Sequence, residues 1–208
     1  MTILVFGTSI TYGVWDIEGG WVQRLRKFLD YKNILEEGYF LVYNLGISGD
    51  NTGNLLERFE LETKFRLKDE DGEIVFIFSV GTNDSQFVRS KNSLRVSPEK
   101  FKDNLQSLIN SAKQFSEKIV FIGLTPVEES KTTPIPWNTD KFYKNEYIQK
   151  YDGIIKKVCE ENNLSFVEVF ERLKGNENLS EDGLHPNSEG HQKIFEIVKD
   201  FLINNKII

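Results

Sequence analysis

Five short apolar runs, separated by longer stretches with helical periodicity, constrain this chain more than any other feature of its sequence. The runs are rich in β-branched and aromatic residues and are apolar at successive positions, as in strands that are covered on both faces. Strands of this kind that alternate with helices are typical of a parallel sheet between two helical layers. The predicted strands are Thr2–Phe6, Phe40–Tyr43, Ile74–Val80, Ile119–Gly123 and Ser165–Val169.

The intervening stretches carry apolar residues three and four positions apart among charged neighbours, which predicts amphipathic helices. One helix has a clear start, because Ser97 can cap it and Pro98 suits its first position. A chain of 208 residues is long enough to bury the core of one such α/β domain, so we expect a single domain over residues 1–208. The predicted helices are Trp21–Leu29, Thr52–Leu67, Pro98–Phe115, Tyr143–Glu161 and Ser188–Asn204.

Two segments fit neither pattern. The charged stretch Lys68–Glu73 is interpreted as a solvated turn. The segment Thr125–Asp140 contains three prolines and Trp137, and it follows a strand at the end of the sheet where α/β enzymes place their sites. It is interpreted either as a lid or substrate wall, or as an ordinary surface loop.

Charge and hydropathy narrow the range of partners. The formal net charge of −6 argues against nucleic acid or an anionic membrane surface as the main partner. No stretch approaches the roughly 20 apolar residues of a membrane span. The first residues lack the basic region and cleavage site of a signal peptide, so we expect a cytoplasmic protein, although a secreted chain trimmed of its signal would look the same. The single cysteine, Cys159, is interpreted as a core residue, and nothing indicates the oligomeric state.

Two polar blocks follow the first two predicted strands. The block Gly7–Gly13 places Ser9 in a turn bracketed by glycines, which can expose a hydroxyl and aim backbone N–H groups at an anion. A loop of this composition can equally bind phosphate. The block Asn44–Thr52 contains Gly46, which either allows close approach of the backbone to a ligand or simply forms a turn before a capped helix.

Two further blocks carry an amide and an imidazole. Asn83, after the third strand, can donate its amide N–H to an oxyanion or cap the next segment. Asp182 stands three residues before His185, close enough to hold one ring nitrogen and leave the other for a serine hydroxyl. Pro186 favours an extended, loop-borne His185. The other histidine, His191, lies inside a predicted helix and is interpreted as structural or exposed.

Together, and in this order, Ser9, Gly46, Asn83 and His185 resemble the Ser-Gly-Asn-His pattern of the SGNH (GDSL-like) hydrolase family. The resemblance runs from the first strand to the last helix. It implies a flavodoxin-like three-layer α/β/α fold with about five parallel strands in the order 2-1-3-4-5. It also implies a triad of Ser9, His185 and Asp182, and an oxyanion hole formed by the backbone N–H groups of Ser9 and Gly46 and the Asn83 side chain.

One residue departs from the family pattern. Thr8 stands where the family usually has Asp before the nucleophile, which puts in doubt the rigidity of the turn and any charge-dependent role of that position. Threonine keeps a short side chain that can form local hydrogen bonds. Because the three predicted triad residues are all present, we do not take Thr8 as a sign of inactivity.

The resemblance implies hydrolysis of a carboxylic ester through an acyl-enzyme, with no metal or organic cofactor. A small soluble ester, such as a carbohydrate acetyl ester, is favoured over a lysophospholipid or acyl thioester because the chain has no long hydrophobic stretch. Trp15, Phe87 and Trp137 could line an acyl pocket or stack on a sugar, or they could simply pack. The rival hypotheses are a flavodoxin-like module for phosphate or flavin, and a non-catalytic relative that binds a glycan or acyl group.

Overall fold

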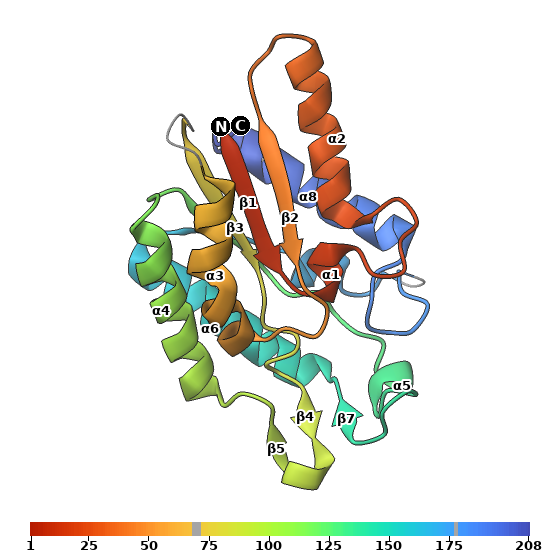
Figure 1. Ribbon diagram of the computed structural model, residues 1–208. Helices are drawn as coiled ribbons and strands as arrows, with labels where there is room; N and C mark the ends of the chain where they lie inside the picture. The colour runs from red at the N-terminus through yellow and green to blue at the C-terminus, as the bar shows by residue number, and fades with distance from the viewer. Residues whose placement is uncertain (68–71, 177–178) are drawn as a thin grey trace.

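A parallel sheet of five strands lies between two helical layers in the computed structural model, which describes residues 1–67, 72–176 and 179–208 (Figure 1). The sheet has the order β2-β1-β3-β6-β8, which confirms the predicted order 2-1-3-4-5. Most of the predicted charged turn, residues 68–71, lies outside the described residues. The strands are β1 (Thr2–Gly7), β2 (Leu41–Gly46), β3 (Ile74–Ser79), β6 (Ile119–Ile122) and β8 (Ser165–Val167).

The five predicted helices are all present. Helices α2 (Gly20–Ile34) and α8 (Ser188–Asn204) cover one face of the sheet. The other face is covered by α3 (Thr52–Arg66), α4 (Pro98–Lys113) and α6 (Asn145–Asn162) (Figure 1). The predicted start of α4 is confirmed, because the Ser97 hydroxyl accepts the Lys100 N–H at 3.2 Å.

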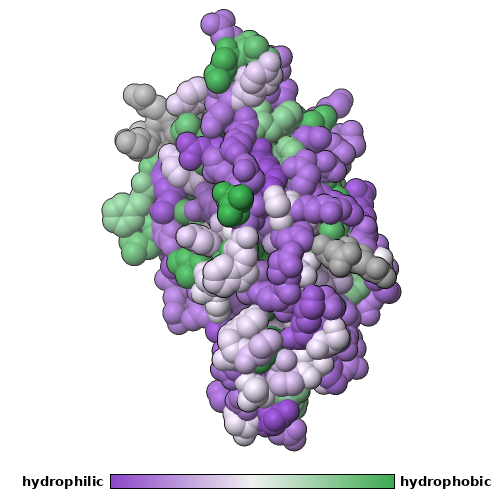
Figure 2. All heavy atoms as spheres, turned by 90° about the vertical axis from the view of Figure 1, so that its right-hand side faces the viewer, coloured by the Kyte–Doolittle hydropathy of each residue, from purple (hydrophilic) through white to green (hydrophobic). Residues whose placement is uncertain are grey.

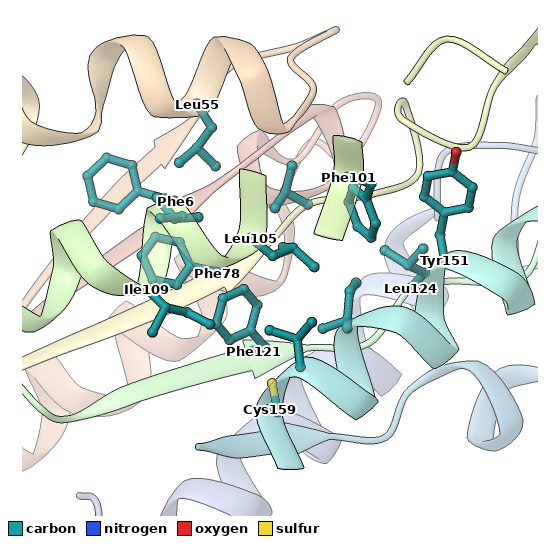
Figure 3. Packing of buried hydrophobic residues seen from close by; sticks show 14 of the residues in the cluster. Phe6, Leu55, Phe78, Phe101, Leu105, Ile109, Phe121, Leu124, Tyr151 and Cys159 are labelled. Carbon is teal, nitrogen blue, oxygen red and sulfur yellow. The ribbon is translucent and has the colours of Figure 1, made fainter. Parts of the chain in front are cut away.

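The strand residues divide into two sets according to the face they occupy. Phenylalanines of β1, β3 and β6 point toward α3, α4 and α6, and Figure 3 shows several of them packed with Leu105 and Ile109 of α4. Branched residues at the alternate positions, such as Ile3 and Val75, point toward α2 and α8. Because both sets of side chains are buried, these strands appear in the sequence as continuous runs of apolar residues. Cys159 lies in the phenylalanine-rich cluster, as predicted.

A small antiparallel sheet lies beyond the carboxyl ends of the main strands (Figure 1). It consists of β5 (Ser93–Leu94), β4 (Phe87–Val88) and β7 (Lys141–Phe142). The segment 125–140, which had no predicted regular element, contains the one-turn helix α5 (Glu129–Thr132) and leads directly into β7. Three further short elements are α1 (Ser9–Tyr12), α7 (Phe170–Leu173) and the 3₁₀ turn Arg89–Lys91.

Strand register brings three of the polar blocks together. Gly7, at the end of β1, pairs with Gly46 of β2 on one side and with Ser79 of β3 on the other. The loops that follow these strands therefore leave the sheet side by side. The face in Figure 2 is mostly hydrophilic with separate apolar spots. None of the helices in the described part of the chain is long and apolar enough to cross a membrane.

Candidate active site

Ser9 is the first residue of α1, two residues after Gly7 ends strand β1. Its backbone N–H has no acceptor among the described residues, as expected at a helix start. Gly7 allows the tight exit from the strand, because a Cβ there would lie 2.0 Å from the Thr11 hydroxyl oxygen. Thr8 is buried and makes no side-chain hydrogen bond to cap α1, so in this chain the turn is held by backbone contacts such as Tyr12 N–H to Thr8 O.

Ser9, His185 and Asp182 lie in one hydrogen-bonded line. The Ser9 Oγ is 3.0 Å from His185 Nε2, and His185 Nδ1 is 2.6 Å from Asp182 Oδ2. The side chains of His185 and Asp182 are only 11% and 18% exposed, so little water competes for these contacts. Ser9 and His185 are 176 positions apart in the chain, and only the fold brings them into contact.

The turn that carries His185 also holds the Asp182 carboxylate in place. The second oxygen, Oδ1, accepts the backbone N–H groups of Leu184 at 2.8 Å and His185 at 2.7 Å. Partial burial opposes ionisation, but the hydrogen bonds from the His185 ring and from these two N–H groups outweigh it and keep the pKa of Asp182 well below its usual value. Asp182 is therefore a carboxylate throughout the neutral range and can stabilise a charged imidazole.

The Gly46 N–H, predicted to serve an oxyanion hole, is already occupied. It donates to the Asn44 Oδ1 at 3.0 Å. Gly46 instead allows α1 to pack on β2, because a Cβ there would lie 2.3 Å from the Tyr12 nitrogen. A different glycine in the same loop, Gly49, has a φ of +86° and open space around its Cα, and its N–H has no acceptor among the described residues. Sequence reasoning missed Gly49 because two glycines in one loop cannot be distinguished by composition.

The Asn83 amide is held on both sides. Its Nδ2 donates to the Asp50 carbonyl at 2.8 Å, and its Oδ1 accepts the Tyr143 hydroxyl at 2.8 Å. The first contact places Asn83 against the loop that contains Gly49. One of the two Nδ2 hydrogens is committed to Asp50, and the other has no acceptor among the described residues. Asn83 is 6% exposed, so this hydrogen faces a sheltered space.

Two tryptophans flank the His185 imidazole. Trp15 meets the His185 ring edge-on, with ring centroids 6.4 Å apart, and Trp137 lies nearly parallel to it at 6.3 Å. Both line a cleft of about 740 Å³, together with Tyr12, Ile17 and other residues of the loop after α1. Phe87 does not line this cleft. It belongs to β4 and packs on Phe142 and Tyr147, which agrees with the packing alternative given for it.

The sequence matches the GDSL-like lipase/acylhydrolase family over residues 5–193. The chain belongs to this family. Known structures share its fold. A lipase/acylhydrolase from Enterococcus faecalis is 22% identical with a TM-score of 0.71, and the match covers 98% of this chain and 96% of that one. The acetylxylan esterase Axe2 from Geobacillus stearothermophilus is also 22% identical with a TM-score of 0.71, and the match covers 97% of this chain and 92% of that one. TesA is 23% identical with a TM-score of 0.70, and the match covers 97% of this chain and 98% of that one. No curated protein matches at the level of sequence.

Membership of the GDSL-like family makes this chain a hydrolase of ester bonds. In residues 1–67, 72–176 and 179–208, no group of three or more His, Cys, Asp or Glu side chains could hold a metal ion. His191 is fully buried and accepts the Trp21 N–H at 3.3 Å on Nδ1. Burial lowers the pKa of His191 to about 4, so it is a neutral structural residue in this GDSL-like hydrolase.

An ion pair that sequence reasoning missed holds the Trp15 loop in this GDSL-like hydrolase. Trp15 has a φ of +66°, which is unfavourable for a large residue. The next residue, Asp16, accepts the N–H groups of Glu18 and Gly20 and pairs with Arg24. Arg24 also donates to the Ser188 hydroxyl at 2.8 Å, at the start of α8 and three residues after His185. The pair therefore joins the two loops that carry Trp15 and His185.

Asp16→Asn is expected to lower the melting temperature at pH 7 by roughly 6–12 °C, because it leaves Arg24 without its buried carboxylate, at a cost of about 3 kcal/mol. Burial favours the neutral acid, but the bonds from Arg24, Glu18 and Gly20 lower the pKa of Asp16 from 3.8 to about 2. The stabilisation is thus complete above pH 4 and is lost as the pH falls toward 2. Calorimetry at pH 7, 4 and 3 should show the difference between wild type and variant shrinking, and a constant difference would contradict this assignment.

The segment 125–140 is attached at its start to the turn that carries His185. The Glu128 N–H donates to the Gly183 carbonyl at 2.8 Å. The Asn145 side chain accepts the Val127 N–H on Oδ1 and donates from Nδ2 to the Val127 carbonyl. Further along, the Tyr143 N–H donates to the Thr132 carbonyl at 3.0 Å. Trp137 is 57% exposed between these attachments, and it contacts the His185 ring. Trp137 is the residue of this segment that lines the cleft.

Proposed function

We propose that this protein is a serine esterase that uses Ser9 as nucleophile, His185 as general base and Asp182 as the residue that orients the base. The observation that carries the proposal is the line of contacts from Asp182 to His185 to Ser9, at 2.6 and 3.0 Å, opening into the cleft between the two tryptophans. Hydrogen bonds of this length allow the imidazole to take the serine proton during attack.

The reaction has two steps. In the first, the Ser9 Oγ attacks the ester carbonyl while His185 Nε2 takes the hydroxyl proton, and the same proton then passes to the departing alkoxide. In the second, His185 takes a proton from water, the resulting hydroxide attacks the acyl carbon, and the proton returns to Ser9 as the acid leaves. Asp182 accepts the Nδ1–H throughout and stabilises the imidazolium that forms in each step.

Three N–H donors are available to stabilise the carbonyl oxygen as it becomes negative. We assign this role to the N–H of Ser9, the free Nδ2 hydrogen of Asn83 and the N–H of Gly49, which replaces Gly46 in the proposed oxyanion hole. The Ser9 and Gly49 groups have no acceptor among the described residues, and the Asn83–Asp50 bond holds the second and third donors together. Such preorganised donors stabilise the tetrahedral intermediate.

We further propose a neutral, compact ester such as a carbohydrate acetyl ester as the substrate. The cleft volume of about 740 Å³ suits a small ligand. Its one carboxylate, Asp16, is neutralised by Arg24, and its walls include the exposed rings of Tyr12, Trp15 and Trp137. Broad apolar ring faces suit the apolar face of a sugar. A phosphate or flavin ligand is less well supported, because the Ser9 hydroxyl is engaged by His185.

Rates of hydrolysis of p-nitrophenyl esters from C2 to C12, measured beside an acetylated sugar, test this substrate class. We expect kcat/KM to be highest at C2 and to fall with chain length, and we expect release of acetate from the sugar. A maximum at C8 or longer would favour a lipid ester or thioester instead. Labelling by a fluorophosphonate probe in wild type but not in Ser9→Ala tests the nucleophile independently of the substrate.

A further inference from the structure

We propose that Tyr143 is a positioning residue for catalysis, which orients the Asn83 amide so that its free hydrogen faces the oxyanion. The inference rests on the proposed function and adds two residues to it. The Tyr143 hydroxyl donates to Asn83 Oδ1 at 2.8 Å, and Gln86 Nε2 donates to the Tyr143 hydroxyl at 2.5 Å. All three side chains are buried, at 6% exposure or less.

An asparagine amide is useful in an oxyanion hole in only one of its two orientations. Rotation by 180° about the last side-chain bond would turn Oδ1 toward the negative oxygen, and the two would repel. The Asp50 carbonyl accepts from Nδ2, and the Tyr143 hydroxyl donates to Oδ1. In the rotated amide the Asp50 carbonyl would face Oδ1 and lose its donor, and the Tyr143 contact would persist only if the phenol accepted from Nδ2 instead of donating. Tyr143 therefore selects the orientation in which Asn83 donates.

Gln86 in turn decides the direction in which Tyr143 donates. A phenol has one hydrogen and can both donate and accept. Because Gln86 donates to the phenol oxygen, the phenol hydrogen is left for Asn83. Burial raises the pKa of Tyr143 to about 12, so the phenol keeps that hydrogen across any ordinary assay range. The result is a one-way chain of donors from Gln86 through Tyr143 to Asn83.

The small antiparallel sheet brings the members of this chain together. Phe87 of β4 pairs with Phe142 of β7. Because the two strands run in opposite directions, the residue before Phe87 and the residue after Phe142 lie across from each other, and these are Gln86 and Tyr143. Gln86 and Tyr143 are 57 positions apart, so their contact depends on this pairing. The small sheet β5-β4-β7, which is separate from the five-stranded sheet, would thereby support the proposed active site.

Tyr143→Phe is expected to lower kcat for p-nitrophenyl acetate by about tenfold while KM changes less than about twofold, because orientation matters most in the transition state. Tyr151→Phe is the matched control. It removes another buried phenol hydroxyl, which donates to the Val96 carbonyl and not to Asn83, and its ring lies in the phenylalanine-rich cluster (Figure 3). We expect Tyr151→Phe to keep the wild-type kcat. A wild-type kcat in a folded Tyr143→Phe variant would overturn the inference.

A double-mutant cycle distinguishes positioning from general damage to the fold. Asn83→Ala alone should lower kcat by on the order of 10²–10³-fold. If Tyr143 acts through Asn83, adding Tyr143→Phe to Asn83→Ala should change kcat by less than about twofold. A further tenfold loss in the double variant would overturn the inference. If Tyr143→Phe does not fold, Gln86→Met, which keeps the side-chain length but removes the donor, should lower kcat about threefold in wild type and not in Asn83→Ala.

The outcome is separable from that of the proposed function. If the proposed serine mechanism is wrong, Ser9→Ala will keep the wild-type activity, whatever the effect of Tyr143→Phe. Failure of the positioning role alone would show as an active wild type, an inactive Ser9→Ala and a Tyr143→Phe variant equal to wild type.

Discussion

Ser9→Ala is expected to lower kcat for p-nitrophenyl acetate by on the order of 10⁵–10⁶-fold with little change in melting temperature. The Ser9 Oγ is the atom proposed to form the acyl-enzyme, and among the described residues it shares a side-chain hydrogen bond with the His185 ring. Without it, catalysis is limited to what the oxyanion donors and binding supply to direct attack by water. The turn should survive, because it depends on the Ser9 carbonyl, which accepts the N–H groups of Gly13 and Val14.

A matched serine in a helix serves as the control for this substitution. Ser107 of α4 donates its hydroxyl to the Asp103 carbonyl at 2.9 Å, four residues back in the same helix. Ser107→Ala should keep full activity and full labelling by a fluorophosphonate. Steady-state rates of both variants, with the melting temperature measured by calorimetry, check the prediction. Activity of Ser9→Ala within tenfold of wild type would exclude Ser9 as the nucleophile.

Asp182→Asn is expected to lower kcat by about 10⁴-fold, close to the effect of losing the equivalent carboxylate in other serine hydrolases. Asparagine keeps the size of the side chain, so the backbone N–H groups of Leu184 and His185 can still donate to its oxygen. Its NH₂ group would then face His185 Nδ1, which would stabilise the ring with the proton on Nε2. In that tautomer Nε2 cannot accept the Ser9 proton.

Asp152→Asn is the control for loss of a buried carboxylate. Asp152 accepts the Leu124 N–H at 2.7 Å beyond the end of β6 and contacts no proposed catalytic residue. Its variant should keep kcat within about twofold of wild type, since no triad contact changes. The kcat of both variants measured at pH 8 distinguishes a specific effect of Asp182 from a general one. An Asp182→Asn enzyme within tenfold of wild type would show that another group orients His185.

The local pattern of the sequence was sufficient for the architecture. Strands covered on both faces leave a signature within five or six consecutive residues, as in Thr2–Phe6, and amphipathic helices leave one within two turns. The parallel arrangement then follows from their alternation, and the structure confirms the order of the five strands. The Asp182–His185 pair is equally local, because both residues occupy one turn.

Local sequence patterns could not predict contacts between residues that are far apart in the chain. Composition could not show that Asn44 occupies the Gly46 N–H while the Gly49 N–H is free, because that depends on how α1 packs against β2. Phe87 looked like a site residue from its position after the third strand, yet pairing of β4 with β7 turns it into a structural neighbour of Phe142.

The division between the two sources of information has a physical cause. The sequence by itself determined the five main strands and the helices between them, because periodicity acts over a few residues. The sheet order and the roles of Ser9, Asn83, Asp182 and His185 were implied by the resemblance of the four polar blocks to a known family. Only the tertiary structure decided which amide is free, which rings flank His185, and that Asp16–Arg24 and Gln86–Tyr143 support the site. Most of those contacts join residues that are far apart in the sequence, and neither the type nor the neighbours of such a residue indicate its partner before the chain folds.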